Sequence, residues 1–213
     1  MEAGKLKALL AKYPAIQKAD AKGRNYIVTM PCRVQWPNLA KPSAAKGATV
    51  AKYSVALIIP KGADLSTLRK LATDTALEKF GRDRAEKLKA AEKLKSPIRK
   101  QIEKVELGEA CGFLEDAEAF WFTASANADY PPQLFGAARN TLALDTPDIY
   151  PGAWALAKIN AYGYENQGNT GVSFGLLALQ KLADDERLAT GTANAGNDFA
   201  PVDGATLESE LAF

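Results

Sequence analysis

Histidine is absent from this chain of 213 residues, and the absence excludes several kinds of catalysis. Without imidazole there is no Ser-His-Asp or Cys-His chemistry, no histidine general base and no histidine metal ligand. Cysteine is also scarce, because only Cys32 and Cys111 occur and they form no C-x-x-C motif. A thiolate zinc site is therefore excluded, a disulfide framework is not indicated, and both thiols are expected to be free and buried.

Long apolar runs are missing too. The longest uninterrupted ones, such as residues 55–59, have five residues, whereas a membrane-spanning helix needs about 20. No apolar segment followed by a cleavage site stands near the start, so no signal peptide is predicted. These absences point to the cytoplasm and to no membrane partner. The phosphate-loop and dinucleotide glycine motifs are also absent, and no cofactor or metal is predicted.

What the chain does have is an uneven distribution of charge. Residues 1–110 carry 23 Lys and Arg against 11 Asp and Glu, whereas residues 111–213 carry 4 against 14. Residues 188–213 contain four acids and no base. A basic surface joined to an acidic tail suggests a polyanionic partner and an internal competitor for it, although a solvated basic face with a solubilising tail would look the same.

The first half predicts two strands and a helical region. Residues 25–36 alternate, with Pro31 suggesting an edge or a bulge, and 50–59 form a second strand. Residues 64–106 have helical spacing, interrupted at Gly81, and Ser96 and Pro97 predict the start of another short helix. In the strand 25–36, six side chains are expected to share one face: Tyr26, Val28, Met30, Cys32, Val34 and Trp36.

After residue 110 the period of two returns. Strands are predicted at 120–126, 141–145, 153–164 and 171–181, the last two as a hairpin. Several short strands with Gly and Pro turns favour a small antiparallel barrel or sandwich, and an OB-type barrel is one candidate that the pattern alone does not select. We expect a basic extension at 1–24, a domain at 25–187 with its helical insertion at 64–106, and a disordered acidic tail at 188–213.

The polar faces of these strands favour binding over catalysis. Single-stranded nucleic acid needs cations along a groove and aromatic rings on which bases stack. The candidate residues are Arg33, Lys41, Lys46, Lys52, Trp121, Lys158, Tyr162 and Tyr164. Trp36 and Trp154 are expected in the core.

One catalytic alternative remains, a magnesium-dependent nuclease that uses Glu115, Asp145 or Asp148. A barrel that serves as a protein-docking scaffold is the other alternative. In the tail, Glu208 and Glu210 with the aromatic Phe213 make a compact docking peptide, because a ring can fill a pocket while carboxylates pair with Lys and Arg.

Several short segments follow one another in a recognisable order and spacing: KSP at 95–97, YPGAW at 150–154, AYGY at 161–164, NQGNTGVS at 166–173, FGL at 174–176, QKL at 180–182 and NDF at 197–199. Taken together, these segments resemble the single-stranded DNA-binding proteins of tailed bacteriophages. The resemblance runs from about residue 25 to the C-terminus and is strongest over 150–182.

This resemblance implies an OB fold, a five-stranded antiparallel Greek-key barrel, that coats single-stranded DNA without sequence preference in phage replication and recombination. It also implies that a tail carrying Glu208, Glu210 and Phe213 contacts phage or host replication proteins, such as a polymerase or a helicase, and competes with DNA. Thr170, where a basic residue is expected, and the sparse acids of the tail depart from the family pattern. The expected protein is not an enzyme, and a homodimer is possible.

Overall fold

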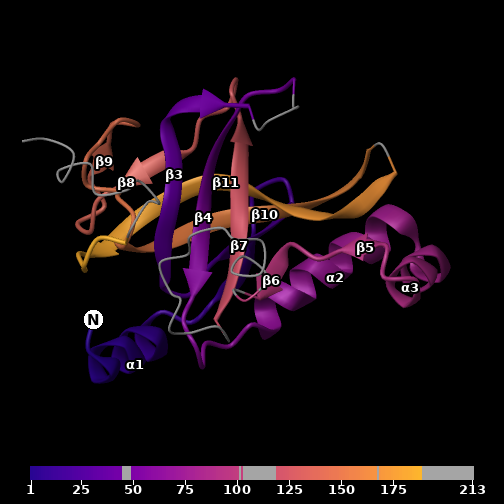
Figure 1. Ribbon diagram of the computed structural model, residues 1–213, viewed down its shortest axis with the longest axis horizontal. Helices are drawn as coiled ribbons and strands as arrows, with labels where there is room; N and C mark the ends of the chain where they lie inside the picture. The colour runs from indigo at the N-terminus through magenta and orange to yellow at the C-terminus, as the bar shows by residue number, and fades with distance from the viewer. Residues whose placement is uncertain (45–48, 101, 103–118, 167, 189–213) are drawn as a thin grey trace, which may run out of the picture.

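The computed structural model describes residues 1–44, 49–100, 102, 119–166 and 168–188 (Figure 1). Strands dominate it, and helices α2 and α3 follow the fourth strand. The elements, in chain order, are α1 (Ala3–Lys12), β1 (Ile16–Ala19), β2 (Asn25–Val28), β3 (Cys32–Ser43), β4 (Lys52–Ile59), α2 (Ser66–Phe80), α3 (Arg82–Ala90), β5 (Leu94–Lys95), β6 (Ile98–Lys100), β7 (Phe120–Asn127), β8 (Gln133–Phe135), β9 (Thr141–Leu142), β10 (Trp154–Asn166) and β11 (Asn169–Ala183).

Five long strands close into a ring. Strand β3 pairs with β4, and β4 pairs with β7, both antiparallel. Strand β7 then runs parallel to β11, β11 forms the long hairpin with β10, and β10 returns to β3. Numbered along the chain, the five strands pair in the order 1-2-3-5-4 and back to 1, which is the arrangement of the OB fold. The predicted fold class is confirmed.

The strand predicted at 25–36 is broken into two pieces at Pro31. Both pieces pair with β10, β2 through Val28 and β3 through Arg33. Between the two pieces, Thr29 is fully buried and takes the place of the regular strand hydrogen bonds to β10. Its amide donates to the Ala157 carbonyl at 2.9 Å, and its hydroxyl accepts from the Ala157 amide at 3.0 Å. The sequence predicts an edge or a bulge at Pro31, because proline has no N–H to donate, and the structure instead divides the strand there.

This break changes which side chains face inward. The predicted face is right for Met30, Cys32 and Val34, which are buried. It is wrong for the first piece, because Ile27 is fully buried and Tyr26 is not. The irregular residues between the two strands shift the phase of the alternation, which a strict period of two does not foresee.

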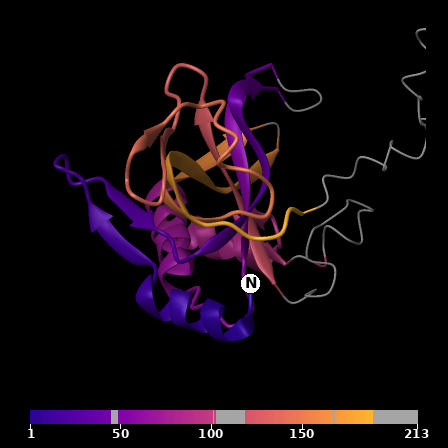
Figure 2. The ribbon, with the colours of Figure 1, turned by 90° about the vertical axis from the view of Figure 1, so that its left-hand side faces the viewer.

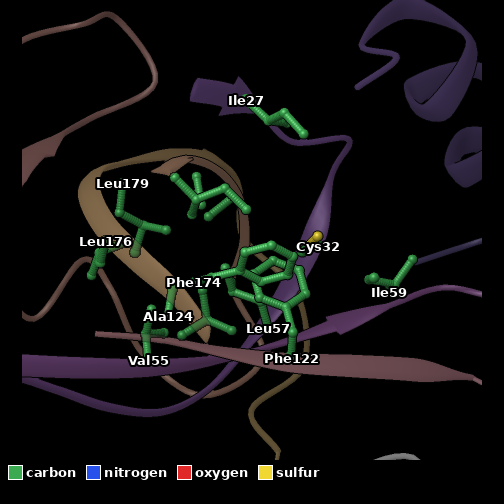
Figure 3. Packing of buried hydrophobic residues seen from close by; sticks show 14 of the residues in the cluster. Ile27, Cys32, Val55, Leu57, Ile59, Phe122, Ala124, Phe174, Leu176 and Leu179 are labelled. Atoms are coloured by element: carbon green, nitrogen blue, oxygen red, sulfur yellow. The ribbon is translucent and has the colours of Figure 1, made fainter. Parts of the chain in front are cut away.

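The core fills the ring and is sealed by α2. Phe122 on β7 and Phe174 on β11 meet edge to face, with their ring centroids 5.2 Å apart (Figure 3). Leu68 and Leu71 of α2 belong to the same buried cluster. Helix α2 ends at Gly81, whose φ of 73° suits glycine, so the predicted interruption is where α3 begins. Burial also raises the pKa of the Cys32 thiol to about 12.

Four short elements differ from the expectation. Residues 94–95, inside the predicted helical region, form β5 and pair parallel with β11. The predicted helix after Pro97 is wrong at its start, because residues 98–100 form β6 and pair antiparallel with β7. Residues 103–105 lie outside the described part. Strand β1 was not predicted and forms a hairpin with β2, which projects from the sheet in Figure 2. Strand β8 was also missed, and it adds to the edge of β11. These strands are short, or they pair with segments that are far away in the sequence. The local sequence pattern therefore does little to predict such pairings.

No helix in the described ranges is long and apolar enough to cross a membrane.

Candidate nucleic-acid interface

Strand β4 begins and strand β7 ends at the top of Figure 1. Residues at these two strand ends line a hollow of about 430 Å³ on the barrel. Two exposed aromatic rings border it, Tyr130 with 76% of its surface exposed and Tyr162 with 38%. The half-buried Lys52 adds a positive charge. The remaining lining residues are Ser125, Ala126, Asn127, Pro131, Asn160, Gly175, Leu176 and Leu177. The hollow therefore combines flat rings, amides and a cation with open access from solvent.

The β10–β11 hairpin shapes the floor of the hollow. The side chain of Asn160 on β10 lies over Gly175 on β11, where any Cβ atom would collide with it. One residue further on, the pairing slips: Lys158 faces Ala178 and Ile159 faces Leu176, so Leu177 has no partner on β10. This bulge leaves Leu177 39% exposed at the hollow. Bulges commonly re-aim a side chain in this way.

Lys52 and Tyr162 are the two predicted site residues that the fold brings together. Lys52 comes from the start of β4 and Tyr162 from the outer face of β10, and both line this hollow. Lys41 is exposed near the end of β3, whose Ser43 is the strand partner of Lys52. Lys46 lies outside the described residues, in the segment that connects these two strands.

Tyr130 is the residue that the sequence reasoning missed. It stands in the turn after β7, with its amide bonded to the Asn127 carbonyl at 3.0 Å. The signal was available, because a tyrosine between Asp129 and Pro131 has no alternating apolar pattern to place it in a core. Asn160 and Leu177 carried no such signal, since their positions depend on the hairpin register and its bulge.

Arg33 is engaged elsewhere, which corrects its predicted place in the groove. Its Nε donates to the Gly152 carbonyl at 3.0 Å and its Nη2 to the Glu186 carbonyl at 2.6 Å. Its guanidinium also lies 3.8 Å from Asp185, and only 12% of the side chain is exposed. Arg33 therefore ties the segment after β11 to the barrel.

Asp185, in the segment after β11, interacts with Arg33, Trp154 and the amino group of Met1. Its carboxylate accepts hydrogen bonds from the Trp154 indole at 2.7 Å and from the amino group of Met1 at 2.8 Å. Burial by itself would raise the pKa of Asp185, but these donors, the Glu186 amide and the charge of Arg33 outweigh it and lower the pKa to about 2. Trp154 itself is buried, as predicted.

Trp121 lies on the outer face of β7, as the alternation predicts, but it is only 7% exposed. Ala56, Ile58 and Ala119 pack with it, and half-buried Trp36 and Leu188 add to this small outer cluster. Its indole N–H donates to the Lys100 carbonyl at 3.1 Å. A base has no room to stack on this ring in the folded protein, so the expected stacking role is corrected to a packing role.

Lys158 and Tyr164 flank the hollow along β10 without lining it. The Lys158 ammonium sits 4.2 Å from the centre of the Tyr26 ring, a cation–π contact. The Tyr164 ring reaches across the hairpin to Gly171, close to Lys95 of β5. Both residues are half-buried.

The other candidates are exposed or lie beyond the described chain. Asp145 and Asp148 are exposed on the loop after β9. No group of three metal-binding side chains occurs within the described ranges. Glu115 and the tail residues Glu208, Glu210 and Phe213 fall outside them.

Comparisons with known proteins match both the sequence and the fold. A family model described as the ssDNA-binding protein of Enterobacter phage Enc34 matches residues 25–211. No curated protein matches the chain in sequence.

Two solved structures share the fold. One is the single-stranded DNA-binding protein from bacteriophage Enc34 in complex with ssDNA, which is 21% identical, covers 84% of this chain and 99% of that chain, and gives a TM-score of 0.60. The other is gp2.5, a single-stranded DNA-binding protein encoded by bacteriophage T7, with 15% identity, 89% and 98% coverage and a TM-score of 0.54. Because the family model spans most of its length, this chain belongs to the family of the phage Enc34 ssDNA-binding protein.

Proposed function

We propose that this protein binds single-stranded DNA without sequence preference and coats it during phage replication and recombination, and that the DNA lies in the hollow between β4, β7, β10 and β11. Tyr130 and Tyr162, two exposed rings that line the same hollow as Lys52, carry this proposal. Membership of the family supports the ligand class, and the position of the hollow on strands 2 and 3 of the barrel supports the site, because OB folds bind oligonucleotides there.

The chemistry of the hollow suits unpaired bases. A tyrosine ring stacks on any base, since every base has a π-face, and each stack contributes about 1–3 kcal/mol. Lys52 neutralises a phosphate, and the amides of Asn127 and Asn160 offer hydrogen bonds to sugar or base edges. Duplex DNA hides its base faces, so the same surface discriminates against it.

Lys41 and Lys46 are two further cations that we assign to phosphate contacts. Lys41 is exposed near the end of β3, whose Ser43 pairs with Lys52, and Lys46 stands between β3 and β4 in the sequence, where OB folds carry a loop that binds oligonucleotides. On the other side, Lys158 and Tyr164 are placed to meet DNA that follows β10. These assignments give a path across the outer face of the hairpin, with Tyr162 at its middle.

The tail completes the proposal. Glu208, Glu210 and Phe213 form a peptide that recruits replication proteins of phage or host, by the pairing of carboxylates with cations and the insertion of the ring. We place the protein in the cytoplasm of the infected bacterium.

The test is a titration of fluorescently labelled oligo(dT), followed by anisotropy, against a duplex of equal length and at several salt concentrations. We expect tight binding to the single strand, weak binding to the duplex, and an affinity that falls steeply as salt rises. An affinity insensitive to salt, or equal for both DNAs, would overturn the proposal and favour the protein-docking scaffold. Anisotropy is preferred to tryptophan fluorescence, because Trp121 and Trp154 are buried.

A further inference from the structure

A second hollow, of about 580 Å³, lies between α2, α3 and β5–β6 and takes no part in the proposed DNA site. Its floor is apolar, formed by the buried Ala76, Ala85 and Val172 with the half-buried Leu77 and Leu94. A hollow of this size is in the range of pockets that hold small ligands or anchor side chains.

The rim of this hollow is strongly basic. Among the described residues, the charged ones that line it are Arg69, Arg82, Lys89 and Lys95, together with the acid Glu86. The Arg82 side chain is 75% exposed, and its contact with Glu86 is a loose 3.8 Å. Such a surface fits a ligand with an apolar anchor flanked by carboxylates. The anchor would pack on the apolar floor while the carboxylates pair with the cations of the rim.

The chain itself supplies such a ligand. Residues 189–213 contain four acids and no base, and their last six residues, ESELAF, combine Glu208 and Glu210 with Leu211 and Phe213. Phe213 matches the apolar floor, and the two glutamates match the cations of the rim. The match of charges and of apolar groups therefore selects this segment as the occupant.

The geometry of the molecule favours the tail of a neighbour. Strand β11 ends at the left of Figure 1, whereas α3 and β5 lie at the far right, and Figure 2 likewise shows the end of β11 in front of the helices. A random-coil chain of 25 residues would have a root-mean-square span of roughly 28 Å. In copies arranged in a row, the basic hollow of one copy would lie next to the end of β11 in the following copy, whereas within one copy these two places lie at opposite ends of Figure 1.

We propose that the basic hollow between α2, α3 and β5 binds the C-terminal acidic segment of an adjacent copy of this chain, with Phe213 on the apolar floor and Glu208 and Glu210 on the rim. A head-to-tail contact of this kind does not close on itself, so it links copies into a row. If the protein coats single-stranded DNA as proposed above, this link makes neighbouring copies bind cooperatively. The tail would be released when a replication protein takes it.

The first test needs no DNA and so does not depend on the proposed function. A photoreactive benzoylphenylalanine replaces Phe213 in the full-length chain, and copies with heavy and normal isotopes are mixed, irradiated and analysed by mass spectrometry. We expect cross-links from the tail to residues 72–98, with heavy–light pairs as frequent as random mixing allows. Cross-links within one copy only, cross-links to Tyr130 or Tyr162, or no cross-links at all would each overturn the proposal.

The second test separates the two proposals. In the double variant Arg82→Glu/Lys89→Glu, the affinity for an oligonucleotide that holds one copy should stay unchanged. On a long strand, the factor by which one bound copy raises the affinity of the next should fall at least about fivefold. The matched control is Lys87→Glu/Lys93→Glu, which makes the same charge change on exposed residues that do not line the hollow. Equal loss in both variants would overturn the docking site, and loss of binding to the short oligonucleotide in both would instead implicate α3 in DNA binding.

Discussion

Asn160 on β10 lies over Gly175 on β11, and its side-chain amide occupies the space that a Cβ atom at residue 175 would need. The pair forms part of the wall of the proposed DNA hollow. The missing side chain of Gly175 therefore leaves room in the strand for the close approach of the Asn160 amide.

Gly175→Ala should weaken DNA binding and leave the fold largely intact. The new methyl group pushes the Asn160 amide aside, and because that amide ends a short flexible side chain, the cost in stability is small. Loss of its hydrogen bonds to DNA should lower the affinity for oligo(dT) about threefold to tenfold, or about 1 kcal/mol. Gly4→Ala is the control, since nothing lies within 4 Å of that position. Binding of wild-type strength in Gly175→Ala would remove Asn160 from the DNA path.

Tyr162→Ala should weaken DNA binding, whereas Trp121→Ala should lower the stability of the fold. Tyr162 is exposed at the hollow, so its loss should reduce the affinity for oligo(dT) by about 1–3 kcal/mol, roughly 5- to 150-fold, without changing the melting temperature. Trp121 is buried, so its loss should lower the free energy of unfolding by about 3 kcal/mol or more. Thermal melts and anisotropy titrations on both variants check this, and a Tyr162→Ala variant that melts early would mean that the ring is structural.

Lys52→Ala should change how binding depends on salt. One phosphate contact on a single strand contributes about 0.7 to the slope of log affinity against log salt concentration. The variant should lose that amount of slope as well as affinity. Lys18→Ala, on the exposed strand β1 away from the hollow, should keep both values. An unchanged slope in Lys52→Ala would show that its ammonium does not meet a phosphate.

Asp185→Asn should make the stability of the protein less dependent on acid pH. The pKa of Asp185 is lowered from 3.8 to about 2 in the fold, so the ionised carboxylate stabilises the native state above about pH 4. That stabilisation, on the order of 1–2 kcal/mol, is lost as the pH falls from about 4 through 2. The wild type should exceed the variant in unfolding free energy at pH 6 and approach it near pH 2.

Urea titrations at several pH values measure this difference. Asp145→Asn is the control, because it makes the same chemical change at an exposed carboxylate on the loop after β9. A difference between wild type and Asp185→Asn that stays constant down to pH 2 would contradict the role of the charged carboxylate.

The alternation and the helical spacing were enough to locate most of the barrel. Strands β4, β7, β10 and β11, the two helices after β4 and the break at Gly81 all follow from local periodicity, because each buries one regular face. The same local rules failed for residues 98–100, which carry a helix start in sequence but pair with β7. Edge pairing supplied by the rest of the sheet outweighed a weak local preference there.

The sequence by itself determined less than the fold did. The missing histidines and the uneven charge favoured binding over catalysis, the strand pattern favoured a small barrel or sandwich, and the resemblance of its segments to phage single-stranded DNA-binding proteins indicated the ligand. Only the tertiary structure decided which cations and rings share a surface. Lys52 and Tyr162 meet because β4 and β10 are placed by the closure of the ring, while Arg33 and Trp121 are drawn into packing by Asp185 and by the outer cluster. Periodicity predicts which face of a strand carries a side chain. Whether a segment from elsewhere in the chain covers that face depends on how the strands pair to close the barrel.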